Sequence, residues 1–294
     1  MRVTNSLTQA TLTSNVETSL NNLNSVSTEI STGKKLNSPS DDPAGAAYSM
    51  SLRASLVDNK QYQANVNQAK TFLTASDSAL SDVSNAILSA RQIASAGANS
   101  TQTPDSLTAL SAQVDGIISS VIQSANSDVH GKYIFSGTMT ATPPYVDNAT
   151  AHTTGPVYQG NTGNVTATVG KTNSLNIGTP GSAVFDSLFS TLKDLKANLA
   201  SGDINAISSD LGKLDTNMSS VSAVRANIGA QITTVNNVTQ NLTRAQGSYQ
   251  DAIANVEEVD LAQAYVQLQS AQNVYQASLV AVSKGYQHSL ADYL

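Results

Sequence analysis

Residues 66–94 read VNQAKTFLTASDSALSDVSNAILSARQIA, and the apolar and small residues in this stretch recur every three or four positions without a break. A repeat of 3.5 residues keeps one stripe of a helix facing a partner helix. The stretch therefore predicts a long helix that packs lengthwise against other helices. The stripe consists of Val66, Ala69, Leu73, Ser76, Leu80, Val83, Ile87, Ala90 and Ala94.

The same spacing recurs elsewhere in the chain. Residues 107–121 repeat it as Leu107, Leu110, Val114, Ile117 and Val121, and a longer seam runs from Ile204 to Val256 with Arg225 as its one charged position. Asp42-Pro43 and Thr103-Pro104 place a capping side chain before a proline, which is typical of a helix start. The predicted helices cover 6–33, 43–98, 104–129, 186–200 and 203–290.

The segment 131–184 differs from its surroundings. It concentrates glycine and proline and holds short β-prone runs at 132–135, 157–158, 165–169 and 174–177. The sequence thus predicts a mainly α protein, a long antiparallel helical bundle or coiled coil formed by the N- and C-terminal regions, with a small β-rich insert. We expect three domains: terminal helices (1–42 with 256–294), a helical rod (43–130 with 185–255) and an outer β insert (131–184).

Composition excludes several function classes. Charged residues make up only 12% of the 294, and 15 Lys and Arg against 21 Asp and Glu give a net charge of −6. Nucleic-acid binding needs clustered positive charge, so it is not expected. The chain has no cysteine and three scattered histidines, which argues against thiolate catalysis and against a metal site. We expect no cofactor.

Membrane and export signals are also not expected. The first eight residues carry one arginine but no apolar run of the kind found in a cleavable signal peptide. No stretch approaches the roughly 20 apolar residues that a membrane span requires. If the chain leaves the cell, we expect it to do so without a cleaved signal.

Two terminal motifs carry a family resemblance. Residues 31–45 read STGKKLNSPSDDPAG, and residues 257–262 read EEVDLA. Both resemble the motifs that follow the first helix and open the last helix of bacterial flagellins and their hook-associated relatives. The runs PSDDP at 39–43, GKYIFSG at 131–137 and SLADYL at 289–294 are similar to hook-associated members in particular.

The resemblance implies a structural protein of the bacterial flagellum rather than an enzyme. The protein is expected to be secreted and to form a ring that joins the hook to the filament. Its expected partners are copies of itself, the other hook-associated junction protein, flagellin and an export chaperone, with no nucleic acid and no membrane. Because the terminal seams are thin and rich in Ala, Ser and Asn, the terminal helices are expected to order only on assembly.

Two sets of residues are candidates for functional positions. The first set is expected to pack between subunits, and it consists of Leu7, Leu12, Val16, Leu20, Leu23, Ile30, Leu261, Tyr265, Leu268, Tyr275, Leu279 and Val282. The second set belongs to the family motifs and is expected to end or cap helices, with its acidic members in first helical turns. It consists of Gly33, Asp41, Asp42, Pro43, Glu257, Glu258 and Asp260.

Other functions remain open at this point. A minor or divergent flagellin that forms the filament itself would share the terminal motifs. A secreted coiled-coil adhesin with a β head would need an anchor or a signal that is not visible in the sequence. A glycan-cleaving insert would rest on Asp147 and Asp186, which are not supported by a second carboxylate at a convincing place.

Overall fold

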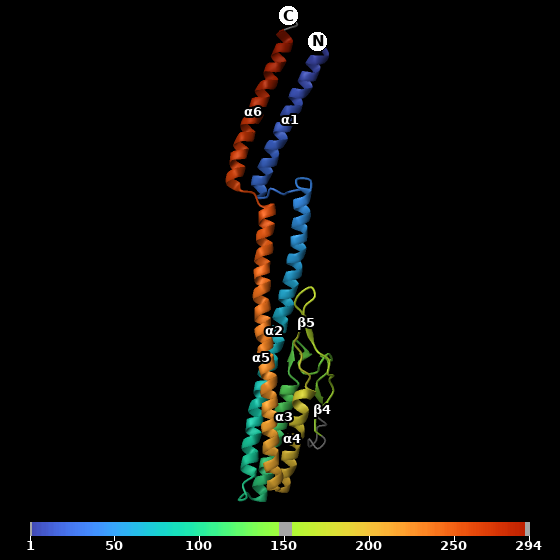
Figure 1. Cartoon of the computed structure of the whole chain (residues 1–294), viewed down its shortest axis with the longest axis vertical. Coiled ribbons are helices and arrows are strands. Elements are labelled where there is room, and N and C mark those ends of the chain that lie inside the picture. The colour runs from blue at the N-terminus through green and yellow to red at the C-terminus, as the bar shows by residue number, and fades with distance from the viewer. Residues whose placement is uncertain (1, 147–154, 292–294) are drawn as a thin grey trace. The chain divides into compact units, whose positions relative to one another are not determined.

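The computed structural model describes the backbone of residues 2–146 and 155–291, and the side chains of 6–146 and 155–284. Asp147 and the side chains of the 289–294 motif lie outside these residues. The chain divides into two compact units: unit 1 is Met1–Asp58 with Ala245–Leu294, and unit 2 is Asn59–Arg244. Figure 1 shows the elements of both.

Long helices dominate the structure, as the sequence predicts. The helices are α1 (Arg2–Thr32), α2 (Pro43–Gly97), α3 (Pro104–Ala125), α4 (Ser182–Ser201), α5 (Ile204–Glu257) and α6 (Leu261–Ala291). The strands are β1 (Asp128–Val129), β2 (Lys132–Tyr133), β3 (Tyr145–Val146), β4 (Val157–Tyr158), β5 (Thr166–Thr168) and β6 (Ser174–Asn176). The mainly α fold with a small β-rich insert is therefore confirmed.

The stripe of α2 forms the centre of the unit 2 core. All nine stripe residues between Val66 and Ala94 are buried, and none is more than 2% exposed. The eight apolar ones share one hydrophobic cluster with residues of α3, α4 and α5, and Ser76 is the buried polar member of the stripe. Arg225 on the α5 seam donates to Asp77 of α2 at 2.9 Å, so the charge at this seam position has a partner.

Three helix predictions need correction. Residues 203–290 form two helices, because Asp260 starts a new helix by accepting from the backbone of Ala262 and Gln263. Helix α3 ends at Ala125 rather than at 129, since the Asn126 amide pairs with the backbone of Tyr145 in both directions. On α3, Ile118 is buried in place of Ile117, which the predicted seam contained and which is only partly buried.

In its described residues, the β region contains three two-stranded antiparallel pairs, β1–β2, β3–β4 and β5–β6. His130 and Gly131 both adopt positive φ between β1 and β2, which is the turn that a two-residue hairpin requires. The predicted strand 132–135 stops at Tyr133. Ile134 and Phe135 continue into the core, where they are almost completely buried.

An aromatic cluster joins the β region to α4. Phe185 packs edge-on against Phe135 with ring centroids 5.0 Å apart and against Tyr145 at 5.7 Å. The Tyr145 hydroxyl donates to Asp186 at 2.6 Å, and burial raises the pKa of this phenol. The Asp186 carboxylate thus accepts a structural hydrogen bond from a buried tyrosine.

The substitution Phe185→Ala should lower the unfolding free energy of unit 2 by about 3–5 kcal/mol, because it removes the ring at the centre of this cluster. Thermal unfolding followed by circular dichroism measures the loss. Val157→Ala is the matched control, since the Val157 side chain is 48% exposed and should cost little. Equal melting temperatures for the two variants would contradict the assigned role of the cluster.

Candidate functional site: the terminal helices and the linker joint

The two terminal helices pack against each other within unit 1. Figure 1 shows α1 and α6 side by side and antiparallel, with the two chain ends at the same end of the pair. Of the described side chains on these two helices, only Ala264 is buried. The pair therefore has almost no closed core of its own.

The structure partly brings the predicted packing residues together. Seven of the twelve are half-buried, and they are Leu12, Val16, Leu23, Ile30, Leu268, Tyr275 and Val282. The other five stay exposed to solvent: Leu7 (68%), Leu20 (38%), Leu261 (49%), Tyr265 (59%) and Leu279 (44%). Contacts inside one chain thus leave much of this apolar surface uncovered.

Two linkers connect the terminal helices to the long helices, and the linkers pair with each other. We call this region, residues 33–42 and 257–260, the linker joint. Lys34 forms an isolated antiparallel bridge with Glu258. The Lys35 amide donates to the carbonyl of Glu257 at 2.8 Å, and the Val259 amide donates to the carbonyl of Gly33 at 3.1 Å. The backbone itself therefore ties the two linkers together.

The helix ends within this joint follow from local capping chemistry in the sequence. Gly33 follows α1 with φ +70°, a conformation that favours glycine. Asp42 Oδ1 accepts from the amides of Ala44 and Gly45, which caps α2 just before Pro43. Asp41 Oδ2 accepts from the amides of Asn37 and Ser38 and so closes the linker turn.

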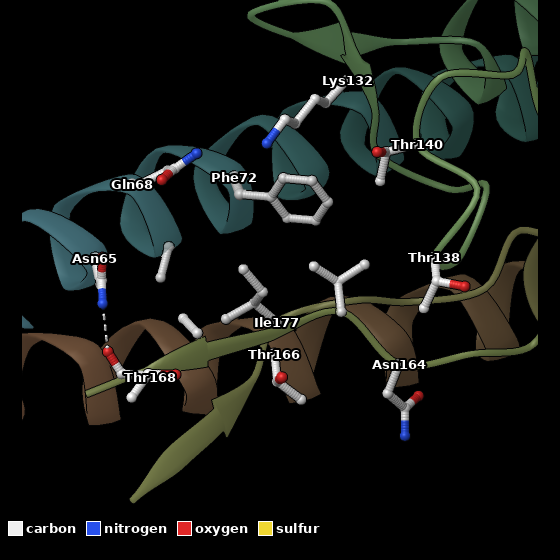
Figure 2. A pocket seen from close by; sticks show the side chains of 13 residues that line it. Asn65, Gln68, Phe72, Lys132, Thr138, Thr140, Asn164, Thr166, Thr168 and Ile177 are labelled. Carbon is white, nitrogen blue, oxygen red and sulfur yellow. Dashed lines mark hydrogen bonds between the residues drawn. The ribbon is translucent and has the colours of Figure 1, made fainter. Parts of the chain in front are cut away.

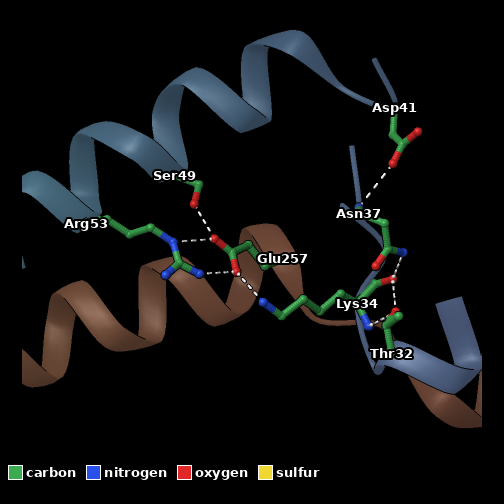
Figure 3. A network of polar contacts seen from close by, with 7 residues as sticks. All are labelled: Thr32, Lys34, Asn37, Asp41, Ser49, Arg53 and Glu257. Carbon is green, nitrogen blue, oxygen red and sulfur yellow. Dashed lines mark hydrogen bonds and ion pairs between the residues drawn. The ribbon is translucent and has the colours of Figure 1, made fainter. Parts of the chain in front are cut away.

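Glu257 is the centre of the joint (Figure 3). Its carboxylate accepts two hydrogen bonds from one edge of the Arg53 guanidinium, at 2.9 Å from Nε and 2.6 Å from Nη2. The Ser49 hydroxyl also donates to it, and Lys34 Nζ lies 3.4 Å from Oε2. Glu257 is only 7% exposed, so a single buried carboxylate connects α2, α5 and the first linker.

The position of Glu257 corrects the expectation from sequence. It does not lie in the first turn of a helix but is the last residue of α5, where an unpaired carboxylate would face the negative end of the helix dipole. Hydrogen bonds from Arg53 and then Ser49, with a smaller contribution from Lys34, lower the pKa of Glu257 to about 2 against the opposing effect of burial.

Sequence reasoning missed the partners of Glu257. Lys34 lies inside the motif at 31–45, but Ser49 and Arg53 lie beyond it, on α2. Their separation of four residues places them on one face of a helix, which is the signal that could have suggested a common partner. Nothing in the sequence indicates that this partner is 204 residues away from Arg53.

A cleft of about 570 Å³ lies between α2 and the β5–β6 hairpin in unit 2 (Figure 2). Phe72 and Ile177 line it, Lys132 lies near Phe72, and the Asn65 amide donates to the carbonyl of Thr168 at 2.8 Å. None of the described residues that line it is a carboxylate or a histidine. Across the described residues, no group of His, Cys, Asp or Glu could hold a metal ion, and no described helix is long and apolar enough to span a membrane.

Comparison with known families identifies the terminal regions. The family model of the bacterial flagellin N-terminal helical region matches residues 3–140, and that of the flagellin C-terminal helical region matches residues 211–294. The chain belongs to the bacterial flagellin family. The two matches together cover about three quarters of this flagellin-family chain and include α1, α6 and the whole linker joint.

Two curated relatives are hook-associated proteins. The chain is 32% identical over 163 residues to flagellar hook-associated protein 3 of Salmonella typhimurium, and 31% identical over 167 residues to that of Escherichia coli K12. Each alignment covers 55% of this chain and 50% of the relative. The chain thus spans about half the length of the curated relatives it matches.

Solved structures share the fold. The putative flagellar hook-associated protein of Vibrio parahaemolyticus superposes with a TM-score of 0.67 at 22% identity, over 74% of this chain and 100% of that chain. Bacillus cereus FlgL superposes with a TM-score of 0.60 at 22% identity, over 69% and 99% of the two chains. The resemblance to hook-associated members of the flagellin family that the motifs indicate is confirmed, and the matching relatives are named hook-associated protein 3.

The substitution Glu257→Gln should loosen the linker joint by about 1–2 kcal/mol, because a neutral amide cannot accept both hydrogen bonds from Nε and Nη2 of Arg53. The effect stays this small because Arg53 and Lys34 are about half exposed and solvent screens their charges. In the wild type, this contribution is present above the unfolded pKa of about 4.5 and is lost as the pH falls through about 2. Hydrogen exchange of the linker amides between pH 2 and pH 6 measures it.

At pH 6 the linker amides of the variant should exchange faster than those of the wild type. As the pH falls, the variant should lose no further protection through this site. Glu17→Gln is the control, since Glu17 is an exposed carboxylate on α1 and its removal should leave the linkers unchanged. The assignment fails if the wild type and the Glu257 variant exchange at equal rates at pH 6.

Proposed function

We propose that this chain is a structural protein of the hook–filament junction, where copies of it form a ring and the terminal helices pack against neighbouring subunits. The observation that carries the proposal is that the two terminal helices bury almost none of their described side chains. Among their described side chains only Ala264 is buried, whereas the helices of unit 2 share an extended buried core. Apolar side chains left uncovered in one chain favour burial in an assembly.

The chemistry of the terminal helices supports packing over solvation. Residues 261–283 of α6 and 3–16 of α1 contain no charged residue. Val266 is 72% exposed and Val280 is 53% exposed in addition to the predicted packing positions. A helix with apolar residues around most of its circumference is stable where other helices surround it. Repeated head-to-tail contacts between copies provide such surroundings.

The proposed place and partners of the protein follow from its similarity to flagellar hook-associated protein 3. A junction ring contacts copies of itself, the other hook-associated junction protein on one side and flagellin on the other. The chain is exported without a cleaved signal peptide, held by an export chaperone, and ends outside the cell on the flagellum. The role is structural rather than enzymatic. Of the three proposed domains (terminal helices, rod and outer β insert), the terminal helices carry the assembly contacts.

Immunogold labelling of intact flagella tests the location. We expect a single band of label at the distal end of the hook. Deletion of the gene should leave hooks without filaments and release flagellin monomer into the medium. Label along the whole filament, together with filaments that persist after the deletion, would instead identify a minor flagellin.

Ordering of the terminal helices on assembly is tested by hydrogen exchange. In the free chain at high dilution, the amides of α1 and α6 should exchange far faster than those of 66–94 in α2, because the terminal pair buries too little surface to offset its ordering entropy. The same amides should become protected in isolated hook–filament junctions. Equal protection of α1, α6 and 66–94 in the free chain would contradict ordering on assembly.

A further inference from the structure

The part of α2 that lies in unit 1 carries two apolar seams on opposite sides. The inner seam is formed by Ser49, Leu52 and Leu56, which are buried or half-buried. A second set at the same three- and four-residue spacing faces the other way, and its members are Ala47, Met50, Ala54 and Val57. We call these four residues the outer stripe. Met50 is 70% exposed and Val57 is 66% exposed.

The outer stripe is confined to unit 1. Continued at the same spacing into unit 2, it would pass through Gln61, Ala64 and Gln68, so no large apolar residue follows Val57. Other large apolar residues follow the same distribution. Of the sixteen that are exposed among the described side chains, eleven lie in unit 1, which contains just over a third of the chain. The exposed apolar surface therefore gathers in the unit that holds the terminal helices.

The size of the outer stripe restricts its partner. A stable complex between two free proteins buries roughly 800 Å² on each side, whereas four side chains along three helical turns offer only a few hundred. Such a stripe holds a partner only when another contact already keeps that partner in place, which raises its effective concentration. In the proposed ring, a neighbouring copy is held in this way by the terminal helices of the same unit.

We propose that the outer stripe of α2, residues Ala47, Met50, Ala54 and Val57, packs against a second copy of this chain in the assembled ring. This inference rests on the proposed function and extends it, because it adds a contact outside the terminal helices. A helix that is apolar on two opposite sides suits a position between two layers of helices. The inner seam closes unit 1, and the outer stripe receives the neighbouring subunit.

Site-specific photo-crosslinking in assembled flagella tests the proposal. A genetically encoded diazirine amino acid is placed singly at position 50, 57, 88 or 266 of the full chain, and the adducts are identified by mass spectrometry. Positions 50 and 57 probe the outer stripe, and position 266 probes the terminal helix α6. Position 88 is the matched control, because Leu88 is also exposed (45%) on α2 but lies in unit 2.

We expect positions 50, 57 and 266 to yield adducts of the chain with itself, and position 88 to yield at least tenfold less. Three outcomes would each overturn the inference and leave the proposed function intact. The first is self-adducts at 266 without self-adducts at 50 and 57, and the second is adducts at 50 and 57 with a different polypeptide only. The third is equal yields at 50, 57 and 88. Absence of the chain from flagella would overturn both the proposed function and this inference.

A charge substitution gives an independent measurement that needs no crosslink. The double variant Met50→Glu with Val57→Glu should reduce the amount of chain in isolated flagella roughly tenfold, because the contact would then bury unpaired carboxylates. The double variant Met50→Leu with Val57→Ile keeps the stripe apolar and should be incorporated at the wild-type amount, as should Leu88→Glu. Circular dichroism of the purified variants shows that they fold. Wild-type incorporation of the folded double glutamate variant would overturn the inference.

Discussion

The terminal helices cannot bury their own apolar surface, and the rest of the structure depends on this constraint. Two helices that touch along one line cover only one side of each other, and here even the side between them has one buried residue among those described, Ala264. Ordering each residue of the pair costs about 1–2 kcal/mol of backbone entropy. The surface that would offset this cost faces outward, so in the proposed ring the missing burial comes from neighbouring chains.

Unit 2, in contrast, buries an extended apolar core within one chain. Its helices bring a continuous stripe of α2 against α3, α4 and α5, and the aromatic rings around Phe185 attach the β region to the same core. Such a core needs no neighbour to close it. The chain therefore contains one part with an extended buried core of its own and one part that exposes its apolar residues, and the boundary between them falls within the continuous helices α2 and α5.

The sequence predicts the core of this fold well, because helical periodicity is a local property that one stretch of chain displays completely. All nine stripe residues from Val66 to Ala94 are buried. The break at 258–260 is harder to predict from periodicity, since the seam continues on both sides of it. The new helix is marked by Asp260 and by the resemblance of 257–262 to the motif that opens the last flagellin helix. The partners of Glu257 could not be found, because the pairing of Ser49 and Arg53 with a residue some 200 positions later depends on the tertiary fold.

The linker joint explains how order can stop at a defined residue. The side chains that bind the Glu257 carboxylate come from α2 and from Lys34 in the first linker, not from α1 or α6. The backbone pairs at Lys35 and Val259 likewise involve only linker residues and the end of α5. None of these contacts requires the terminal helices to be formed. The joint can therefore remain closed while α1 and α6 unfold, and in the proposed assembly it fixes the two points from which both helices grow when neighbouring subunits supply the missing surface.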